Sequence, residues 1–255
     1  MDPPDIWSLN TDGMRPGTWW WWFWLFFWEN PQNPQKPRQF MVLWSTKNDP
    51  KIICNGLTVD NHSISTNPVK CDFGGTIGAW YYNGEKMIDE YILSKSPMTV
   101  QRSPTRMLSS NQPFKTVFSE PDDGVFKINI GDDFEFTAES LDDEFSRLSY
   151  TRGVFFKVFD YRMTRMSRLK LKVREKSGNR LKGTAYFQKV QVNAPIPPWH
   201  WGIFHFQDYS LTYYRPFIGS ALLSKNPFKK DPLNINKGLK STVRFHDHKK
   251  DRTYR

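Results

Sequence analysis

The segment from 19 to 28, WWWWFWLFFW, is the feature that most limits the folds open to this chain. It holds six tryptophans, three phenylalanines and one leucine, and a glutamate and a proline-rich loop follow it. About 20 apolar residues are needed to cross a bilayer as a helix, so this segment is too short for that role. The three prolines in ENPQNPQKPR also exclude a helix from the loop. The segment therefore predicts a β-strand, paired across the loop with a second strand over 39–45.

The rest of the chain carries the alternating pattern of half-exposed strands. In RLKLKVR, Leu169, Leu171 and Val173 share one face, while arginines and lysines occupy the other. Asn-Gly pairs at 55–56 and 83–84 are typical of type I′ hairpin turns. Many short strands separated by closely spaced turn signals indicate an antiparallel barrel or sandwich. We therefore predict an all-β fold.

Both faces of the aromatic strand are apolar, whereas a strand with one face in water needs only one apolar face. One interpretation is a barrel strand whose inner face lines a ligand cavity while its outer face is covered. The other is a central strand packed on both sides with no cavity. A buried indole N–H requires an acceptor, so tryptophan is a costly filler for a plain core. This favours the cavity.

Charge divides the chain into two halves of opposite sign. Residues 1–146 hold 12 Lys and Arg against 20 Asp and Glu, while residues 147–255 hold 24 against 6. A basic half can face anionic lipid, or it can pair with the acidic half. No nucleic-acid-binding motif appears, so no nucleic acid is expected as a partner. The candidates for contact with an anionic membrane surface lie on one strand: Arg168, Lys170, Lys172 and Arg174.

The two cysteines and the N-terminus suggest a compartment. Cys54 and Cys71 have no CxxC spacing and no nearby histidine or cysteine, so neither a zinc site nor a disulfide framework is predicted. The opening MDPPD lacks the basic start of a secretory signal. We expect a cytoplasmic protein, with a peripheral membrane location as the alternative. No metal and no organic cofactor are expected.

A family resemblance rests on the tryptophan-rich first strand, the Asn-Gly meander and the later His200-Trp201-Gly202. Together they resemble the lipocalin-like family that includes carotenoid 1,2-hydratases (hydroxyneurosporene synthases), attachment-protein relatives and Diels–Alderase relatives. The resemblance implies two packed, antiparallel lipocalin-like β-barrels that act on apolar, often isoprenoid, molecules without a metal. On this basis we predict a first unit over 1–146 and a second over 147–255, the second truncated at its C-terminus. Pro198 and Trp199 stand where the family's acidic residue is expected.

Hydration of an isolated alkene requires a carboxyl group that stays protonated near neutral pH and a group that delivers water. An apolar, aromatic pocket raises the pKa of a carboxyl by desolvation and stabilises a carbocation over its rings. Our candidates are Asp208 or Glu29 as the acid and His200 for the water. Each candidate also has a purely structural alternative. Asp208 would be a turn residue, Glu29 a charge at the end of a strand, and His200 a hydrogen-bonded histidine. The candidates for ligand contact are Trp19, Trp21, Phe23, Trp199, Trp201 and Phe204.

The sequence therefore predicts a protein that binds a hydrophobic, isoprenoid-type small molecule in an aromatic-lined barrel. Whether it also hydrates or isomerises that ligand stays open. A non-catalytic carrier, or a β-protein bound to a membrane surface, is the alternative. A third hypothesis is a partner-binding β-sandwich whose aromatic strand belongs wholly to the core.

Overall fold

The computed structural model describes residues 6–7, 9, 15–54, 56–61, 64–66, 69–110, 115–141, 143–155, 159–193, 199–216 and 241–255. Every regular element in these residues is a β-strand, so the described part holds no helix that could cross a membrane. The strands are β1 Trp19–Trp28, β2 Arg38–Lys47, β3 Lys51–Cys54, β4 Leu57–Asp60, β5 Ser65–Thr66, β6 Lys70–Tyr82, β7 Met87–Arg102, β8 Thr105–Ser109, β9 Thr116–Asp122, β10 Val125–Ile130, β11 Phe134–Ser140, β12 Ser149–Phe155, β13 Phe159–Glu175, β14 Arg180–Asn193, β15 Trp199–His205, β16 Tyr209–Pro216, β17 Thr242–Asp247 and β18 Arg252–Tyr254.

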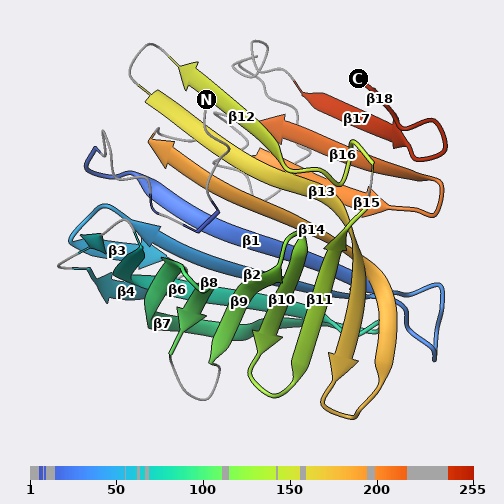
Figure 1. Cartoon of the computed structure of the whole chain (residues 1–255), viewed down its shortest axis with the longest axis horizontal. Coiled ribbons are helices and arrows are strands. Elements are labelled where there is room, and N and C mark those ends of the chain that lie inside the picture. The colour runs from blue at the N-terminus through green and yellow to red at the C-terminus, as the bar shows by residue number, and fades with distance from the viewer. Residues whose placement is uncertain are drawn as a thin grey trace, which may run out of the picture. The chain divides into compact units, whose positions relative to one another are not determined.

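Ten of these strands close into an antiparallel barrel (Figure 1). The order β1-β2-β6-β7-β8-β9-β10-β11-β13-β14 returns to β1, because β11 pairs with β13 and β14 pairs with β1. The aromatic strand lies between β2 and β14, with Trp28 opposite both Arg38 and Gly183. Most consecutive barrel strands are also neighbours, as in an up-and-down barrel. The prediction of an all-β, antiparallel barrel fold is confirmed.

The strand β13 is longer than the barrel needs and pairs with two partners along one edge. Its first part pairs with β12, from Phe159 opposite Phe155 to Arg165 opposite Ser149, and its last part pairs with β11. A shift in register against β14 lies between Met166 and Leu169. Such a bulge bends a strand and increases its local twist. It lies where β13 passes from one partner to the other.

The barrel interior is lined by the even-numbered face of β1, from Trp20 to Trp28, whose side chains are at most 1% exposed. The odd-numbered face, from Trp19 to Phe27, is half-buried. A register shift of one residue would exchange the two faces, so the pairing with β2 and β14 fixes which rings point inward. The predicted alternation on β13 is confirmed, because Leu169, Leu171 and Val173 are buried in the same core.

By internal contacts the chain divides into two compact units. One comprises Met1–Asp142 and Ser146–Ala194, and the other Asp143–Phe145 and Pro195–Arg255. The barrel belongs to the first unit, and its strands β13 and β14 follow residue 146 in the chain. In the described residues of the second unit, the strands form one antiparallel sheet in the order β15-β16-β17-β18.

Candidate ligand-binding site

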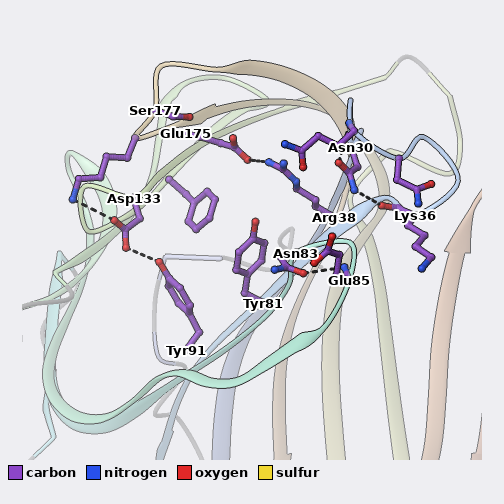
Figure 2. Close-up of a pocket in the computed structure, with 14 residues that line it drawn as sticks. Asn30, Lys36, Arg38, Tyr81, Asn83, Glu85, Tyr91, Asp133, Glu175 and Ser177 are labelled. Atoms are coloured by element: carbon purple, nitrogen blue, oxygen red, sulfur yellow. Dashed lines mark hydrogen bonds and ion pairs between the residues drawn. The ribbon is translucent and has the colours of Figure 1, made fainter.

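An open pocket of about 660 Å³ lies at the barrel mouth where β1 ends (Figure 2). Four hairpin turns meet at this mouth: β1–β2, β6–β7, β10–β11 and β13–β14. They meet because antiparallel neighbours place alternate turns at the same end of a barrel. Each turn contributes polar side chains, while the strand ends beneath contribute rings. The pocket is therefore assembled from four segments that are far apart in the sequence.

Three aromatic side chains, Tyr81, Tyr91 and Phe134, line the pocket. The ring centroids of Tyr81 and Phe134 are 5.3 Å apart, and those of Tyr81 and Tyr91 are 5.8 Å apart, both pairs edge-to-face. Trp28 stacks on Tyr81 at 5.9 Å. Edge-to-face and stacked pairs are the arrangements that aromatic rings prefer. The pocket thus has an aromatic floor, defined by Tyr81, Tyr91 and Phe134.

An ion pair between Arg38 and Glu175 closes one side of the pocket. Arg38 Nη1 lies 2.5 Å from Glu175 Oε1, and the two side chains are only 14% and 11% exposed. The same carboxylate oxygen accepts a hydrogen bond from Trp28 Nε1 at 3.4 Å, and the other accepts one from Asn179 Nδ2 at 3.2 Å. A partly buried charge is tolerated only where it is paired and hydrogen-bonded. This carboxylate meets both conditions and links the barrel wall to the rim.

The floor tyrosines are held in their neutral form. Tyr91 Oη donates to Asp133 Oδ2 at 2.5 Å, and burial together with that carboxylate raises the pKa of Tyr91. Burial also raises the pKa of Tyr81, against the opposing effect of the nearby Arg38. Lys176 Nζ lies 3.7 Å from the second oxygen of Asp133. Near neutral pH the floor therefore presents neutral phenols.

The amides at the rim shape the turns. Asn83 Oδ1 accepts hydrogen bonds from the backbone N–H groups of Glu85 and Lys86, at 2.9 and 3.0 Å. Gly84 has a φ of +99°, and a Cβ there would overlap the side-chain amide of Asn30. A turn lies at Asn83-Gly84, but Tyr82 pairs with Met87, so the connection is a four-residue loop and not the predicted two-residue type I′ turn. The left-handed backbone conformation at Gly84 is one that glycine adopts without strain.

The rim carries equal numbers of opposite charges. Three cations and three anions line the pocket, and two of the cations are paired with anions of the rim. A balanced rim offers no net charge to attract a free anion or cation. The charged lining residues are Lys36, Arg38, Lys176, Glu85, Asp133 and Glu175.

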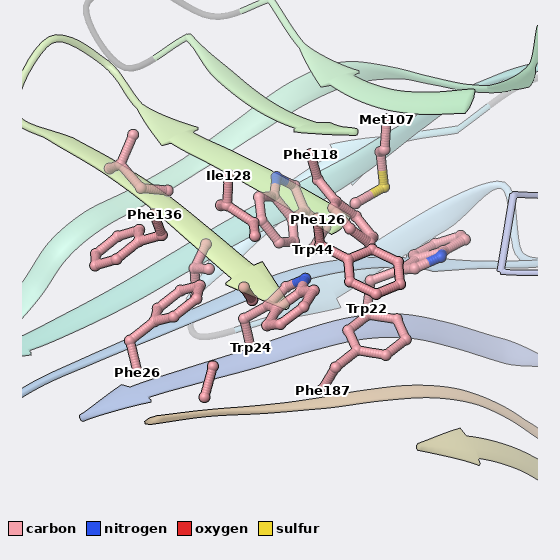
Figure 3. Close-up of a cluster of buried hydrophobic side chains, with 14 of the residues drawn as sticks. Trp22, Trp24, Phe26, Trp44, Met107, Phe118, Phe126, Ile128, Phe136 and Phe187 are labelled. Carbon is pink, nitrogen blue, oxygen red and sulfur yellow. The ribbon is translucent and has the colours of Figure 1, made fainter. Parts of the chain in front are cut away.

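Below the pocket, the chain's own rings fill the middle of the barrel (Figure 3). Phe26 stacks on Phe136 with centroids 4.0 Å apart, and Trp24 lies 4.8 Å from Phe187 and 5.4 Å from Phe118. Spacings of this size leave no room for a guest between the rings. The open volume therefore lies at the mouth and not among the rings in the middle of the barrel.

The structure places the predicted ligand contacts Trp19, Trp21 and Phe23 on the outer face of β1, half-buried. Lys47 Nζ lies 5.3 Å from the Trp19 ring. The inward wall is formed instead by the even-numbered residues of the same strand. The sequence could not distinguish the two faces, because both are apolar.

The other predicted ligand contacts lie on β15 in the second unit. Trp201 is half-buried, and Phe204 is 48% exposed with its ring 6.3 Å from that of Tyr213. Trp199 lies in β15, but its side chain falls outside the described part of the structure. The predicted ligand contacts are therefore divided between the two units.

The predicted acids are both exposed. Glu29 follows β1 and accepts a hydrogen bond from the backbone N–H of Lys182 at 2.9 Å. Asp208 lies in the turn after β15 and forms an ion pair with Lys249 at 2.9 Å. Both carboxyl groups are in contact with solvent and are not enclosed by aromatic side chains. Neither residue lines the pocket.

The predicted water-delivering residue, His200, lies on β15 opposite Arg215 of β16. Its side chain is half-buried in the second unit, while Glu29 belongs to the first. Asp208 lies beyond the other end of β15, eight residues along the chain. Among the residues that the structure describes, no group of three or more metal-ligating side chains is found.

Two of the predicted membrane contacts on β13 are neutralised by carboxylates on the adjacent β11. Lys172 Nζ lies 2.6 Å from Glu139 Oε1, and Arg174 pairs with Glu135. Lys170 is exposed and Arg168 is half-buried. The basic strand predicted from the sequence exists, but part of its charge is balanced across the sheet.

The pocket residues that sequence reasoning missed are Tyr81, Tyr91, Arg38, Asp133 and Glu175. They come from five different strands or turns, and only the closure of the barrel brings them together. A weak signal exists in the sequence, because each turn that meets at the mouth contains charged or amide residues.

Similarity to known proteins is found among solved structures. No protein-family model matches the chain, and no curated protein matches it. Among solved structures, the chain is similar to a protein provisionally named AttH from Nitrosomonas europaea. The identity is 13%, the TM-score is 0.47, and the match covers 99% of this chain and 73% of the other. At this level the similarity concerns the fold alone.

Proposed function

We propose that the barrel mouth binds a small hydrophobic molecule with a neutral polar head. The observation that carries the proposal is the pocket of about 660 Å³ in which an aromatic floor lies beneath a charge-balanced rim. Ligand sites of this volume typically combine apolar walls with a few placed polar groups. The apolar part of the ligand would rest on Tyr81, Tyr91 and Phe134. Its head would hydrogen-bond to the rim.

An isoprenoid alcohol is the finer form of this proposal. Its unsaturated chain fits an aromatic floor, and a hydroxyl group can both donate and accept at a rim that holds carboxylates and cations. The family resemblance of the aromatic strand points to the same class of molecule. A fatty acid would bring a negative charge to a rim whose cations and anions are equal in number, and two of its three cations, Arg38 and Lys176, are already paired.

Titration calorimetry with farnesol tests the proposal. We expect saturable binding with one site, and binding at least about tenfold weaker in Tyr81→Leu, because a ring contact of the floor is lost. Tyr150→Leu is the matched control, since Tyr150 is an exposed tyrosine on β12 and does not line the pocket. Equal affinity in the wild type, Tyr81→Leu and Tyr150→Leu would overturn the proposal.

Binding without turnover is the form we favour, because Glu29 and Asp208 are both exposed. Incubation with farnesol, followed by mass spectrometry, should return the ligand unchanged. A mass gain of one water would instead indicate a hydratase, and loss of that product in Asp208→Asn or Glu29→Gln would identify the acid. A product that is an isomer of farnesol would indicate an isomerase.

A peripheral membrane role is a second candidate, and the observation that favours it is the exposed Lys170 beside the partly balanced Lys172 and Arg174 on β13. We propose a cytoplasmic location, in which the protein would meet anionic lipid through this strand. Co-sedimentation with phosphatidylserine vesicles should then weaken as salt is raised. Binding that depends on neither lipid charge nor salt would contradict the role.

A further inference from the structure

The end of the barrel opposite the mouth is filled by apolar side chains from the N-terminal segment. Ile6, Trp7 and Leu9 are 5–6% exposed and belong to the same buried cluster as the inner face of β1. The Trp7 ring lies 4.5 Å from that of Phe118 on β9. A segment that comes before the first strand thus completes the packing of the barrel interior.

Two hydrogen bonds hold this segment in place. Trp22 Nε1 donates to the carbonyl oxygen of Ile6 at 2.9 Å, and Trp7 Nε1 donates to Glu120 Oε2 at 2.8 Å. These two hydrogen bonds, together with the Trp7 ring inserted among other rings, are contacts of the kind that a bound molecule makes with a pocket. Among the residues described, no paired strand ties Ile6, Trp7 or Leu9 to the barrel.

Two indoles of the wall have donors without an acceptor. Trp20 Nε1 and Trp24 Nε1 are fully buried and have no hydrogen-bond partner within the described part of the chain. By contrast, Trp22 donates to Ile6, and Trp44 Nε1 donates to Thr116 Oγ1 at 2.8 Å. A buried N–H without a partner loses its hydration and gains nothing in return, so it favours any guest that brings an acceptor.

Trp24 lies next to the region that the segment fills. Figure 3 shows Trp24 beside Phe118, and their ring centroids are 5.4 Å apart. Trp7 contacts the same Phe118 ring at 4.5 Å. A molecule that took the place of the Trp7 ring would therefore contact Phe118, one ring away from the Trp24 indole. The required chemistry is a fused or extended apolar body with one carbonyl or ether oxygen.

We propose that Ile6, Trp7 and Leu9 act as an internal stopper, and that they compete with a small apolar molecule bearing a hydrogen-bond acceptor for this end of the barrel. The site is separate from the mouth, so it does not depend on the proposed function. The free protein exists mainly with the stopper in place, and the apparent affinity for the guest is reduced by the fraction of molecules in which the stopper is out.

Titration calorimetry with 2-acetylnaphthalene tests the competition. Its two fused rings match an indole in size, and its carbonyl is an acceptor. We expect Trp7→Ala to bind the probe at least about tenfold more tightly than the wild type, because the competitor is weakened. Ile53→Ala is the control, since Ile53 is 66% exposed on β3. It should bind as the wild type does.

A second variant covers the case in which Trp7→Ala folds poorly. Glu120→Ala leaves every ring of the interior intact and removes the acceptor of Trp7 Nε1. Its far-UV circular dichroism should match that of the wild type, and its affinity for the probe should also rise, by a smaller factor. If neither Trp7→Ala nor Glu120→Ala binds more tightly than Ile53→Ala, the stopper is overturned.

The role of the free indole donors is tested with 2-ethylnaphthalene, which lacks only the acceptor. In the Trp7→Ala background, we expect it to bind about three- to tenfold more weakly than 2-acetylnaphthalene, as the loss of one hydrogen bond implies. Adding Trp24→Phe and Trp20→Phe should remove this preference, whereas Tyr81→Leu at the mouth should leave it intact. A preference that survives both tryptophan substitutions would overturn the assigned donors.

Discussion

At the scale of single residues, the barrel mouth holds charges in places where water reaches them poorly. Arg38 Nη1 pairs with Glu175, and Glu175 also accepts a hydrogen bond from Trp28 Nε1. The buried Nε of Arg38 has no hydrogen-bond partner among the described residues. Removal of either member of the pair therefore leaves the charge of the other unpaired in a partly buried position. The consequences for stability depend on which member is removed and on whether both are.

Arg38→Met should destabilise the protein by about 2 to 4 kcal/mol, because it leaves the Glu175 carboxylate unpaired. Urea unfolding followed by tryptophan fluorescence measures the change. The double variant Arg38→Met with Glu175→Met should recover much of the loss, since two apolar side chains need no partner. A double variant that is as unstable as the two single losses added together would contradict this account.

Tyr91→Phe should flatten the alkaline limb of the stability curve. Burial and the Asp133 carboxylate raise the pKa of Tyr91 above the ordinary tyrosine value of about 10 in the folded state. Below pH 10 both states hold the proton, and above it the unfolded chain releases its proton first, so stability falls as pH rises. Urea midpoints between pH 8 and pH 11, about the range in which tyrosine and lysine titrate, should fall less in Tyr91→Phe than in the wild type. Parallel curves would remove Tyr91 as a cause.

At the scale of the strands, β1 and β14 approach closely where the barrel closes. Gly183 lies opposite Trp28, and a Cβ at this position would overlap the backbone carbonyl of Phe27. Backbone atoms cannot move aside as the end of a side chain can. The glycine is therefore needed for close approach rather than for an unusual backbone angle.

Gly183→Ala should cost about 2 to 4 kcal/mol of stability, because the pairing of β14 with β1 must shift. Gly74→Ala is the matched control. A Cβ at Gly74 would make only ordinary contacts, at 3.4 Å, with its neighbours. Thermal unfolding by circular dichroism should show a much lower melting temperature for Gly183→Ala than for Gly74→Ala.

Sequence reasoning succeeds for strands with one wet face and fails where both faces are dry. The alternation of Leu169, Leu171 and Val173 with basic residues fixes their orientation, since charges cannot point into an apolar core. On β1 no polar residue marks the outer face, so the inward set, Trp20 to Trp28, follows only from pairing with β2 and β14. The mouth could not be predicted either, because closure of the ring brings its turns together.

At the scale of the whole molecule, the barrel closes through contacts between distant parts of the chain. Trp28 pairs with Gly183, and Phe134 pairs with Glu175. The first of these joins the first barrel strand to the last. The entropy of closing so long a loop must be lost before the contacts form. Closure is therefore expected late in folding.

Refolding from urea should accordingly be slow, with a main phase of about one second or longer, as is usual for barrels with non-local pairing. Stopped-flow tryptophan fluorescence measures it. Gly183→Ala should slow this phase further if closure of β14 on β1 limits the rate. Complete refolding within about one millisecond would contradict late closure.

The packed rings of the interior also have an optical consequence. Trp24 lies 4.8 to 5.9 Å from four phenylalanine rings, and further indoles line the same strand face. Light absorbed by any one of these chromophores can pass to its neighbours before it is emitted. A quencher placed at either end of the barrel would thus reduce most of the tryptophan emission at once. Intrinsic fluorescence would therefore report the entry of a quenching ligand into the barrel.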